Sequence, residues 1–308
     1  MINTVTIIGS INVDNILHIQ QLPQPGETIA MSGFSTAGGG KGANQAIAAA
    51  RSGAKTAFIG AVGNDTNGEF MKTQLVENGI NIQAVKTTDE AATGQAYILL
   101  QASGQNSIII DHGANAKVTI EDVDQARAAI AAADFLVTEF ETPLPADEEA
   151  FKLARAAGVK TILNPAPAIT QIPESLLRLT DIIVPNETES MAITGIPVDD
   201  EVSLQSSANY YHRLGVETVI ITLGERGAYV ANGDISELVP AYKVQAVDTT
   251  AAGDTFIGAL AAELRSDYSN LLDAVRYASR ASSLTVQKLG AFPSIPLRKS
   301  VLAAQANA

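Results

Sequence analysis

Two short apolar runs in the first part of the chain, residues 4–9 and 56–62, predict buried β-strands. Each run is bounded by polar residues or glycines, and we expect a helix after each, over residues 43–52 and 68–78. The beginning of the chain therefore predicts strands that alternate with helices.

From about residue 118 onward, helix-length and strand-length segments alternate regularly. The expected strands are residues 135–140, 161–165, 181–185 and 218–223. The expected helices between most of them are residues 120–132, 146–157 and 204–214. Such alternation predicts an α/β fold, a three-layer sandwich in which helices cover both faces of a mostly parallel sheet. Only the alanine-rich tail after Ser300 is expected to be dispensable.

A different pattern at residues 93–112 predicts a second, smaller sheet. Residues 93–100 and 106–111 read as two strands joined by a short turn, with no helix between them. Residues 16–35 hold further extended pieces, broken by prolines and a glycine. We expect one domain over residues 1–308, with a small sheet from about 12–37 and 93–112 inserted in it. An isolated small sheet is only marginally stable, which favours pairing with a second subunit.

Composition and charge narrow the possible partners. Hydrophobic residues make up 46% and charged residues 17% of the 308 residues, which is ordinary for a soluble α/β protein. The net charge of −13 argues against nucleic-acid binding, and it means that a phosphate ligand needs local donors. The absence of cysteine excludes disulfides and thiolate chemistry. Without a signal-peptide pattern or a membrane-length apolar run, we expect a cytoplasmic protein with no membrane partner.

One turn near the C-terminus combines an anion site with a carboxylate. Residues 247–258 read Val-Asp-Thr-Thr-Ala-Ala-Gly-Asp-Thr-Phe-Ile-Gly and lead into a helix expected over residues 255–264. Ala251, Ala252 and Gly253 are small, and N–H groups at a helix start lack intrahelical partners, which suits an anion. Asp254 beside them suits a base that takes a proton from a hydroxyl attacking a bound phosphate. The alternative is an ordinary helix N-cap.

Ligands of a parallel sheet bind beyond the C-terminal strand ends, where the polar residues are Glu141, Asn164, Asn186, Glu189 and residues 222–227. Two further polar stretches lie nearer the start of the chain. Residues 38–46 read Gly-Gly-Gly-Lys-Gly-Ala-Asn-Gln-Ala, a turn into a helix that matches neither a Walker A loop nor Gly-x-Gly-x-x-Gly. Its glycines favour close approach by a ligand, and a flexible turn with a solvated lysine is the alternative. Asn12 and Asp14 would point the same way on an extended chain, which suits a ligand with several hydroxyls. A strand-end turn is the alternative for this pair.

Both glycine-rich stretches resemble signatures of a known family. Residues 248–258 are similar to the C-terminal signature of the ribokinase-like (PfkB) family of carbohydrate kinases, and residues 38–46 to its N-terminal signature. The resemblance extends from about Ile7 to about Ser294. It implies the family's α/β fold, with the small sheet as a lid over the sugar and a frequent dimer contact. It also implies ATP-dependent phosphorylation of a sugar, and the form of the first signature indicates D-ribose, phosphorylated at O5.

The resemblance implies roles for individual residues. Asp254 would be the base, and the N–H groups of Ala252 and Gly253, in the turn that begins at Ala251, would hold the transferring phosphoryl oxygens. The sugar would be held by Asn12, Asp14, Gly40, Lys41, Gly42, Ala43, Asn44, Glu141 and Asp254. ATP would be held by Asn186, Thr222, Leu223, Gly224, Glu225, Arg226, Gly227, Gly253, Asp254 and Ser279. Taken alone, the loop at residues 222–227 reads as an ordinary turn between a strand and a helix.

Two metal sites are implied as well. Asn186 and Glu189 resemble the family motif that positions Mg²⁺ through water, and the same spacing is typical of a helix capping box. A monovalent cation, expected to be K⁺, would be bound by Asp248, Thr250, Thr285, Lys288, Gly290 and Ser294. Lys288 stands where related kinases commonly have arginine, and Ser279 where they often have asparagine or histidine against the adenine.

Several activities fit this resemblance. Phosphorylation of D-ribose is the expectation, and a kinase for deoxyribose, fructose or a nucleoside such as adenosine is the alternative within the family. A non-catalytic, sugar-responsive binding protein is the alternative outside it, and the intact Asp254 and anion turn argue against that. The expected ligands are D-ribose, ATP, Mg²⁺ and K⁺. The expected assembly is a homodimer joined through the small sheet.

Overall fold

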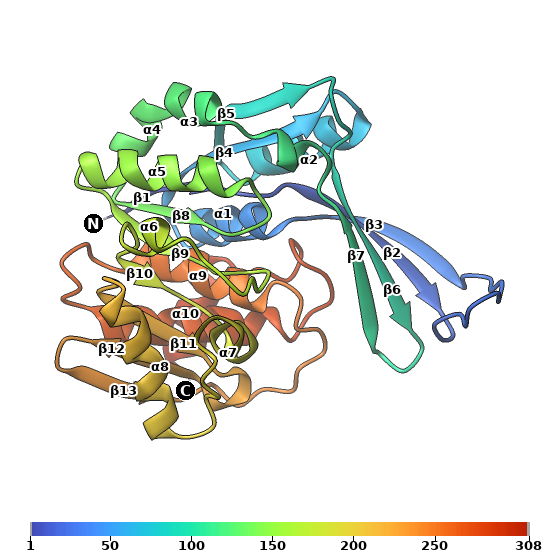
Figure 1. Ribbon diagram of the computed structural model, residues 1–308. Helices are drawn as coiled ribbons and strands as arrows, with labels where there is room; N and C mark the ends of the chain where they lie inside the picture. Colours follow the sequence, from blue (N-terminus) through green and yellow to red (C-terminus); the bar gives the residue numbers. More distant parts are fainter. Residues whose placement is uncertain (1, 307–308) are drawn as a thin grey trace.

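The computed structural model describes residues 2–306, and its larger sheet has nine strands (Figure 1). The strand order is β13-β12-β11-β10-β9-β8-β1-β4-β5. The sheet is parallel from β11 to β5, and β12 and β13 add an antiparallel edge. The strands are β1 (Thr4–Ile8), β4 (Lys55–Gly63), β5 (Asn81–Thr88), β8 (Phe135–Thr138), β9 (Lys160–Leu163), β10 (Ile182–Ile183), β11 (Thr218–Thr222), β12 (Ala228–Asn232) and β13 (Ile235–Val239).

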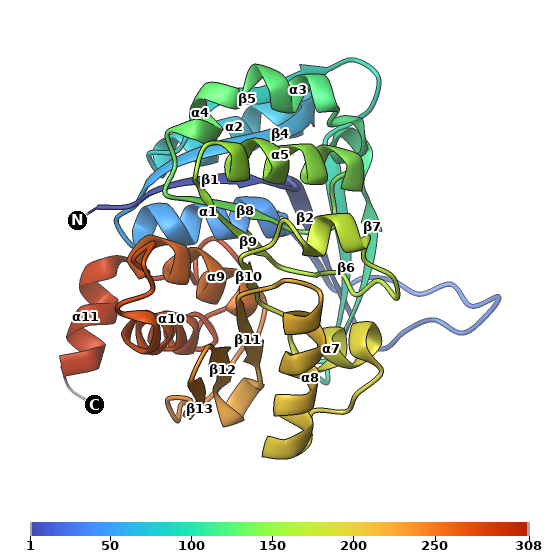
Figure 2. The same cartoon turned by 60° about the vertical axis from the view of Figure 1, so that its left-hand side comes forward.

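Helices cover both faces of this sheet, as Figures 1 and 2 show from two directions. One layer comprises α1 (Lys41–Arg51), α2 (Thr66–Glu77), α9 (Ala252–Glu263), α10 (Leu271–Thr285) and α11 (Arg298–Ala306). The other comprises α3 (Ile120–Gln125), α4 (Arg127–Ala131), α5 (Leu144–Ala156), α6 (Glu174–Leu177), α7 (Glu187–Thr194) and α8 (Glu201–Arg213). The predicted three-layer α/β sandwich is confirmed.

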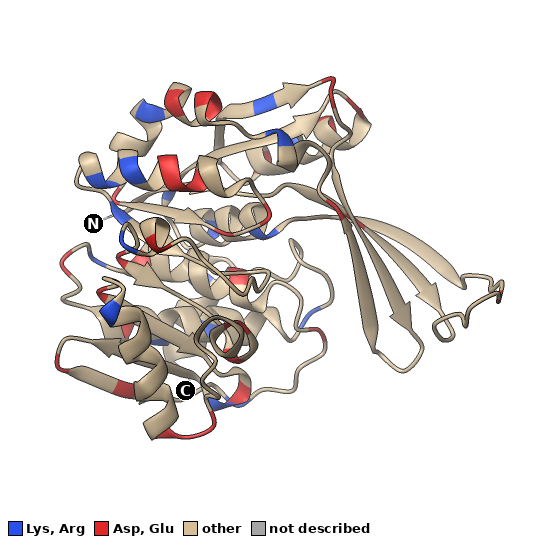
Figure 3. Ribbon diagram, viewed as in Figure 1, with Lys and Arg blue, Asp and Glu red and all other residues tan. Residues whose placement is uncertain are grey.

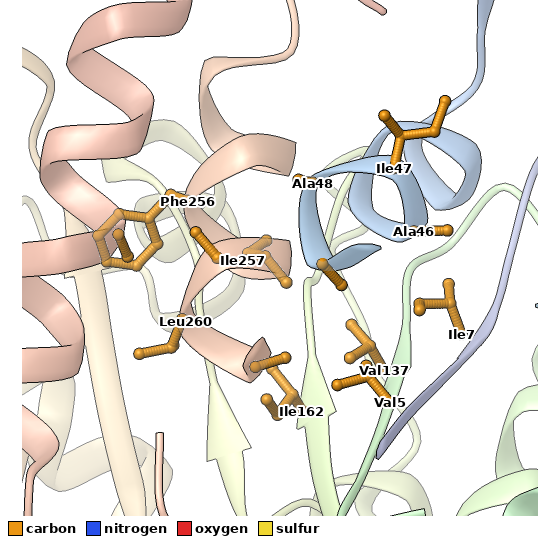
Figure 4. Packing of buried hydrophobic residues seen from close by; sticks show 14 of the residues in the cluster. Val5, Ile7, Ala46, Ile47, Ala48, Val137, Ile162, Phe256, Ile257 and Leu260 are labelled. Carbon is orange, nitrogen blue, oxygen red and sulfur yellow. The ribbon is translucent and has the colours of Figure 1, made fainter. Parts of the chain in front are cut away.

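Alternation of side chains along the strands builds two apolar cores, one on each face. On β8, Phe135 and Val137 belong to one buried cluster and Leu136 to the other. Ile257 and Leu260 of α9 belong to the same cluster as Val137, which Figure 4 shows close up. Each such side chain contributes about 1.5–3 kcal/mol when it is fully buried. Burial on both faces explains why these strands read as continuous apolar runs.

Helices α1 and α9 approach each other closely, and this contact shapes the site. A Cβ atom at Gly258 would overlap the backbone carbonyl oxygen of Gln45 and would lie 2.6 Å from Ala48 Cβ. A side chain there would push the two helices apart. Because both helices begin at the same edge of the sheet, their first turns lie together.

The predicted small sheet is confirmed, with strand order β3-β2-β6-β7. Its strands are β2 (Asn12–Ile19), β3 (Gly33–Gly39), β6 (Gly94–Gln101) and β7 (Asn106–Asp111). It projects from one side of the larger sheet in Figure 1. The glycine-rich stretch is divided: β3 ends at Gly39, and Gly40, with φ of 93°, makes the turn into α1.

Two expectations need correction. The single helix expected over residues 120–132 is interrupted at Ala126, so that α3 and α4 are separate. The tail after Ser300, expected to be dispensable, is an ordered part of the domain, because it forms most of α11. Val301 is fully buried in the core, and Arg280 donates to the carbonyl oxygen of Ala304 at 2.8 Å. Among the helices of residues 2–306, none combines the length and apolar character that crossing a membrane requires.

Candidate active site

Asp254, the predicted base, lies in the first turn of α9 and is held by two amides of α1. Asn44 Nδ2 donates to Asp254 Oδ2 at 2.9 Å, and Gln45 Nε2 donates to Asp254 Oδ1 at 3.2 Å. Lys41 lies one turn before Gln45, and its charge also acts on the Asp254 carboxylate. The structure thus brings Asp254, Lys41 and Asn44 together as the sequence predicted, and it adds Gln45.

The balance of burial and charge leaves Asp254 more basic than an exposed aspartate. Burial raises the pKa of Asp254, while Lys41, Asn44 and Gln45 lower it and Glu141 raises it further. The net direction is upward. Burial alone would lower the pKa of Lys41, but the carboxylates of Asp254 and Glu141 help to hold it above its usual value. Lys41 therefore stays charged beside a carboxylate that is poised to accept a proton.

The turn before Asp254 presents free N–H groups. Ala251 has φ of 60° and ψ of 11°, a left-handed conformation, and caps α9 without a side-chain hydrogen bond. The Ala252 N–H, which was expected to be available to the phosphoryl group, instead donates to Thr249 O at 3.2 Å, because the left-handed Ala251 closes a turn there. Within residues 2–306, the N–H groups of Gly253 and Asp254 have no acceptor. A Cβ at Gly253 would meet nothing within 4 Å, so open space lies before the turn. An anion fits this arrangement.

The predicted sugar residues form a second group, next to Asp254. Asn12 and Asp14 lie on the same face of β2, and Asn12 Nδ2 donates to Glu141 Oε2 at 3.4 Å. Burial, with the charges of Glu141 and Asp254, raises the pKa of Asp14 to about 7. A Cβ at Gly39 would overlap the Asp14 carboxylate, so glycine at this position leaves room for it.

Glu139 is a buried carboxylate of this site that sequence reasoning missed. Its Oε1 accepts the N–H of Ser10 and its Oε2 that of Glu141, both at 2.5 Å. It thereby connects the end of β1 to the loop after β8. Burial and the charge of Glu141 raise the pKa of Glu139 to about 8, against the two backbone hydrogen bonds that lower it. Its position two residues before Glu141, after an apolar strand, was the available signal.

Asn186 and Glu189 form a capping box at the start of α7. Asn186 Oδ1 accepts from the Glu189 N–H, and the Asn186 N–H donates to Glu189 Oε2, both at 2.8 Å. The helix-cap geometry is therefore present. The pKa of Glu189 is raised by burial and by the charge of Asp254, while the Asn186 N–H and Lys41 lower it. Because the charges of Asp254 and Lys41 act on Glu189, the start of α7 belongs to the same site as these two residues.

The predicted nucleotide loop follows β11 at the same edge of the sheet. Its short 3₁₀ helix, Gly224–Arg226, is braced by Arg226, which donates to the carbonyl oxygens of Val198 and Asp199 at 2.8 and 3.0 Å. Arg226 also pairs with Glu187 of α7 at 2.5 Å. Ser279 lies on α10, is half-buried, and donates to no acceptor in the described chain.

The residues of the implied K⁺ site lie on two segments joined by Asp248. Asp248 Oδ1 accepts from the N–H and hydroxyl of Thr250 at 2.9 and 2.7 Å, and Oδ2 accepts from the Gly290 N–H at 2.8 Å. Thr285 and Ser294 direct their hydroxyls to backbone carbonyls nearby. Lys288 follows α10 in the same segment. One carboxylate among carbonyl oxygens is a donor set that fits a large, weakly hydrated cation.

No cluster of three or more His, Cys, Asp or Glu residues in the described range is arranged to hold a metal ion. In the view of Figure 3, Lys and Arg are scattered among Asp and Glu and gather on no single element. The site itself is acidic, because Lys41 is surrounded by the carboxylates that affect its pKa: Asp254, Glu141, Glu139 and Glu189.

Comparison with known proteins gives several matches. A ribokinase from Staphylococcus aureus (strain COL) is 50% identical over 302 residues, which cover 98% of this chain and 99% of that protein. A bifunctional ribokinase/ribose-5-phosphate isomerase A from Fructilactobacillus sanfranciscensis is 50% identical over 299 residues, 97% of this chain and 55% of that longer protein. The structure of Arabidopsis thaliana ribokinase complexed with ribose and ATP is similar with a TM-score of 0.88, at 34% identity and 98% coverage of each chain.

The family model of the pfkB family carbohydrate kinases matches residues 3–298. Both glycine-rich turns and the carboxylate at the start of α9 lie within that match. This chain therefore belongs to the pfkB family of carbohydrate kinases.

Proposed function

We propose that the protein transfers the γ-phosphoryl group of ATP to O5 of D-ribose. The observation that carries this proposal is the Asp254 carboxylate beside the open anion turn, with Asn12 and Asp14 on its other side. The relatives support the choice of ligands, since full-length matches are ribokinases and one related structure holds ribose and ATP.

The proposed chemistry is an in-line displacement with Asp254 as the base. Asp254 accepts the proton of the O5 hydroxyl as that oxygen attacks the γ-phosphorus, and ADP leaves. The N–H groups of Gly253 and Asp254, which the turn at Ala251 and Ala252 directs into the open space, stabilise the charge on the phosphoryl oxygens. The upward shift of the Asp254 pKa favours proton transfer to it.

In this proposal the sugar hydroxyls are bound by polar groups around the turn between β3 and α1. Their side chains and N–H groups come from Asn12, Asp14, Gly40, Lys41, Gly42, Ala43, Asn44 and Glu141. Most of these residues are buried, so a hydroxyl that fits replaces lost water contacts, whereas a missing hydroxyl leaves a buried group unpaired. That difference supplies selectivity among sugars.

ATP would lie between the loop of residues 222–227 and α10. Ser279 would face the adenine, and Asn186 would face the phosphates. Both carboxylate oxygens of Glu189 already accept hydrogen bonds from Asn186. Mg²⁺ would therefore be held by the phosphates and, through water, by these two residues. Its chemistry there is to neutralise charge on the transferring phosphoryl group.

The small sheet, from about residues 12–37 and 93–112 of a single domain, would act as the lid and as the contact of a homodimer. Its outer strands expose large apolar side chains: Phe34 is 54%, Ile108 53% and Ile109 59% exposed. Apolar surface of this kind favours burial against a second subunit. A cytoplasmic location, where ATP is available, completes the proposal.

The proposal is tested by a coupled assay of ADP release with ribose, deoxyribose, fructose and adenosine. We expect the highest kcat/KM for ribose. Turnover of another acceptor at a higher kcat/KM would replace ribose with that acceptor. ADP release from none of them, with ribose bound in calorimetry, would favour a sugar-responsive binding protein.

Activation by K⁺ is also proposed, at Asp248, Thr250, Thr285, Lys288, Gly290 and Ser294. A cation there would fix the backbone of residues 249–253, and hence the direction of the N–H groups in the anion turn. In Tris buffer, KCl should raise the initial rate severalfold over a matched choline salt. Asp248→Ala should remove most of that response.

Asp267→Ala is the matched control for Asp248→Ala. Asp267 accepts the Ser269 N–H in a similar turn at 3.0 Å, but it lies in the loop between α9 and α10, outside the proposed cation site. Its variant should keep the K⁺ response. If the wild-type rates in choline and in potassium are equal, the proposed cation site does not activate the enzyme.

A further inference from the structure

A short chain of side-chain amides connects the central sheet to Asp254. Asn164 follows β9, and its Nδ2 donates to the carbonyl oxygen of Val184, after β10, at 3.2 Å. Asn164 Oδ1 accepts from Gln45 Nε2 at 3.1 Å, and the same nitrogen donates to Asp254 Oδ1 at 3.2 Å. Gln45 is fully buried and Asn164 nearly so. The chain runs from the sheet through α1 to the first turn of α9.

The carboxylate of Asp254 fixes the orientation of the Gln45 amide. An ionised carboxylate only accepts hydrogen bonds, so Gln45 presents its NH₂ group and not its oxygen. As a result, Gln45 Oε1 is buried and finds no hydrogen-bond partner among residues 2–306. A buried acceptor without a partner is unfavourable, and such local conflicts concentrate at functional sites. The Gln45 N–H donor toward Asp254 is therefore present at a cost to the stability of the fold.

The packing of α1 on α9 gives Gln45 a fixed position. Gly258 leaves no space between α9 and the Gln45 backbone, and the side chain is enclosed on all sides. Asn44 holds the other oxygen of Asp254 and is also a proposed sugar ligand. Gln45 differs, because within residues 2–306 the hydrogen-bond partners of its side chain are Asn164 and Asp254 alone.

We propose that Gln45, supported by Asn164, is a positioning residue that orients the carboxylate of Asp254 and favours its ionised form. This inference rests on the proposed function, in which Asp254 is the base for a sugar hydroxyl. In the proposed function Gln45 is a ligand of neither substrate, since its amide is directed to Asn164 and Asp254, so its contribution would belong to the chemical step and not to the binding of ribose or ATP.

The other charges that act on Asp254 are the same in every variant of the test. Lys41 of α1 and Glu141 after β8 act on it directly, and Asp14 of β2 and Glu189 of α7 are coupled to it. Gln45→Leu therefore reports the loss of one N–H donor, and Gln45→Glu reports that loss together with an added negative charge.

The test is the pH dependence of kcat/KM with ribose and ATP for Gln45→Leu and Gln45→Glu. Leucine is similar in size to glutamine but has no N–H donor. The acid limb of the pH profile should therefore move up by about one pH unit, which corresponds to a tenfold change in the proton affinity of Asp254. Glutamate adds a negative charge, so its acid limb should lie higher still. We expect kcat of Gln45→Leu to fall about tenfold, the effect of a misdirected base. The KM values should change by less than about threefold.

Asn164→Ala supplies an independent variant that leaves α1 unchanged. It should move the acid limb in the same direction by a smaller amount. The double variant Gln45→Leu/Asn164→Ala should match Gln45→Leu alone in kcat, since Asn164 acts through Gln45. Gln205→Leu is the control. Gln205 of α8 lies on the opposite face of the sheet, where its amide donates a hydrogen bond to Asn209 and accepts one from the Tyr229 hydroxyl. Its pH profile should match that of the wild type.

An acid limb that stays at the wild-type pH in both Gln45 variants would overturn the inference, as would an equal shift in Gln205→Leu. Asp254→Asn measured in parallel separates this failure from that of the proposed function. Wild-type turnover in Asp254→Asn would show that Asp254 is not the base, and the proposed mechanism would fail. If Asp254→Asn loses turnover while the pH profiles of the Gln45 variants match that of the wild type, Asp254 remains the base and only the proposed role of Gln45 is wrong.

Discussion

Replacement of Asp254 by asparagine is expected to lower kcat by about 10²–10⁴, the range for a positioned acid–base group. Asparagine keeps the shape of the side chain but cannot accept the proton of the sugar hydroxyl. Ribose affinity should change little, because the proposed sugar contacts of Asn12, Asp14 and Glu141 remain. The measurements are steady-state turnover and ribose binding by calorimetry.

Asp181→Asn provides a structural control for this substitution. Asp181 is also a nearly buried carboxylate, and it accepts the Thr161 N–H at 2.9 Å at the opposite end of the parallel strands. Its variant should be less stable and yet keep kcat once folded. If Asp254→Asn turns over like the wild type, Asp254 is not the base.

The second large effect is expected on sugar affinity. Asp14→Ala should weaken ribose binding by about 10- to 100-fold, since loss of one partner in a buried polar site costs roughly 1–3 kcal/mol. ATP binding should change far less, because Asp14 lies on the strand of the small sheet beside the proposed sugar pocket. Calorimetry with each ligand separately measures both affinities. Equal weakening of both would mean that Asp14 supports the fold instead.

Stability against pH gives an independent check on Asp14. Its pKa is raised from 3.8 to about 7 in the folded protein, so its contribution to stability is full below about pH 4 and is lost as the pH rises through about 7. Asp14→Asn removes this loss. The ligand-free variant should therefore have a higher Tm than the wild type at pH 8, although it binds ribose more weakly.

The fold could be predicted where local pattern and packing agree. Strands such as β1 and β4 are apolar because they are buried on both faces, and their positions were predicted to within one residue. The edge strand β5 was missed, because its edge position leaves it half exposed and its apolar residues sparse. The helix α11 was missed because a single buried residue, Val301, docks its alanine-rich sequence.

The site could be predicted only where residues form a local motif. Asp254 and Asn44 belong to glycine-rich turns whose composition is itself unusual. Glu139 stands outside these turns, Gln45 lies in the first of them, and Asn164 follows a predicted strand, but the sequence shows the partners of none of the three. They lie on a loop, a helix and a strand end, and they acquire their partners only when β1, β9, α1 and α9 are packed together. Pairing over such distances along the chain is not visible in one sequence.

The acidic surroundings of Lys41 have a consequence for the direction of turnover. In the proposed reaction D-ribose is uncharged and enters without repulsion, whereas ribose 5-phosphate would carry its new charge beside the carboxylates of Asp14, Glu141 and Asp254. Two like charges about 4 Å apart near a protein surface repel by about 4 kcal/mol. In the same proposal Asp254 holds the proton of the hydroxyl after transfer and is neutral, which would weaken this repulsion until the proton leaves. Loss of that proton would restore the charge and favour release of the product, so that departure of the sugar phosphate and deprotonation of the base would be linked.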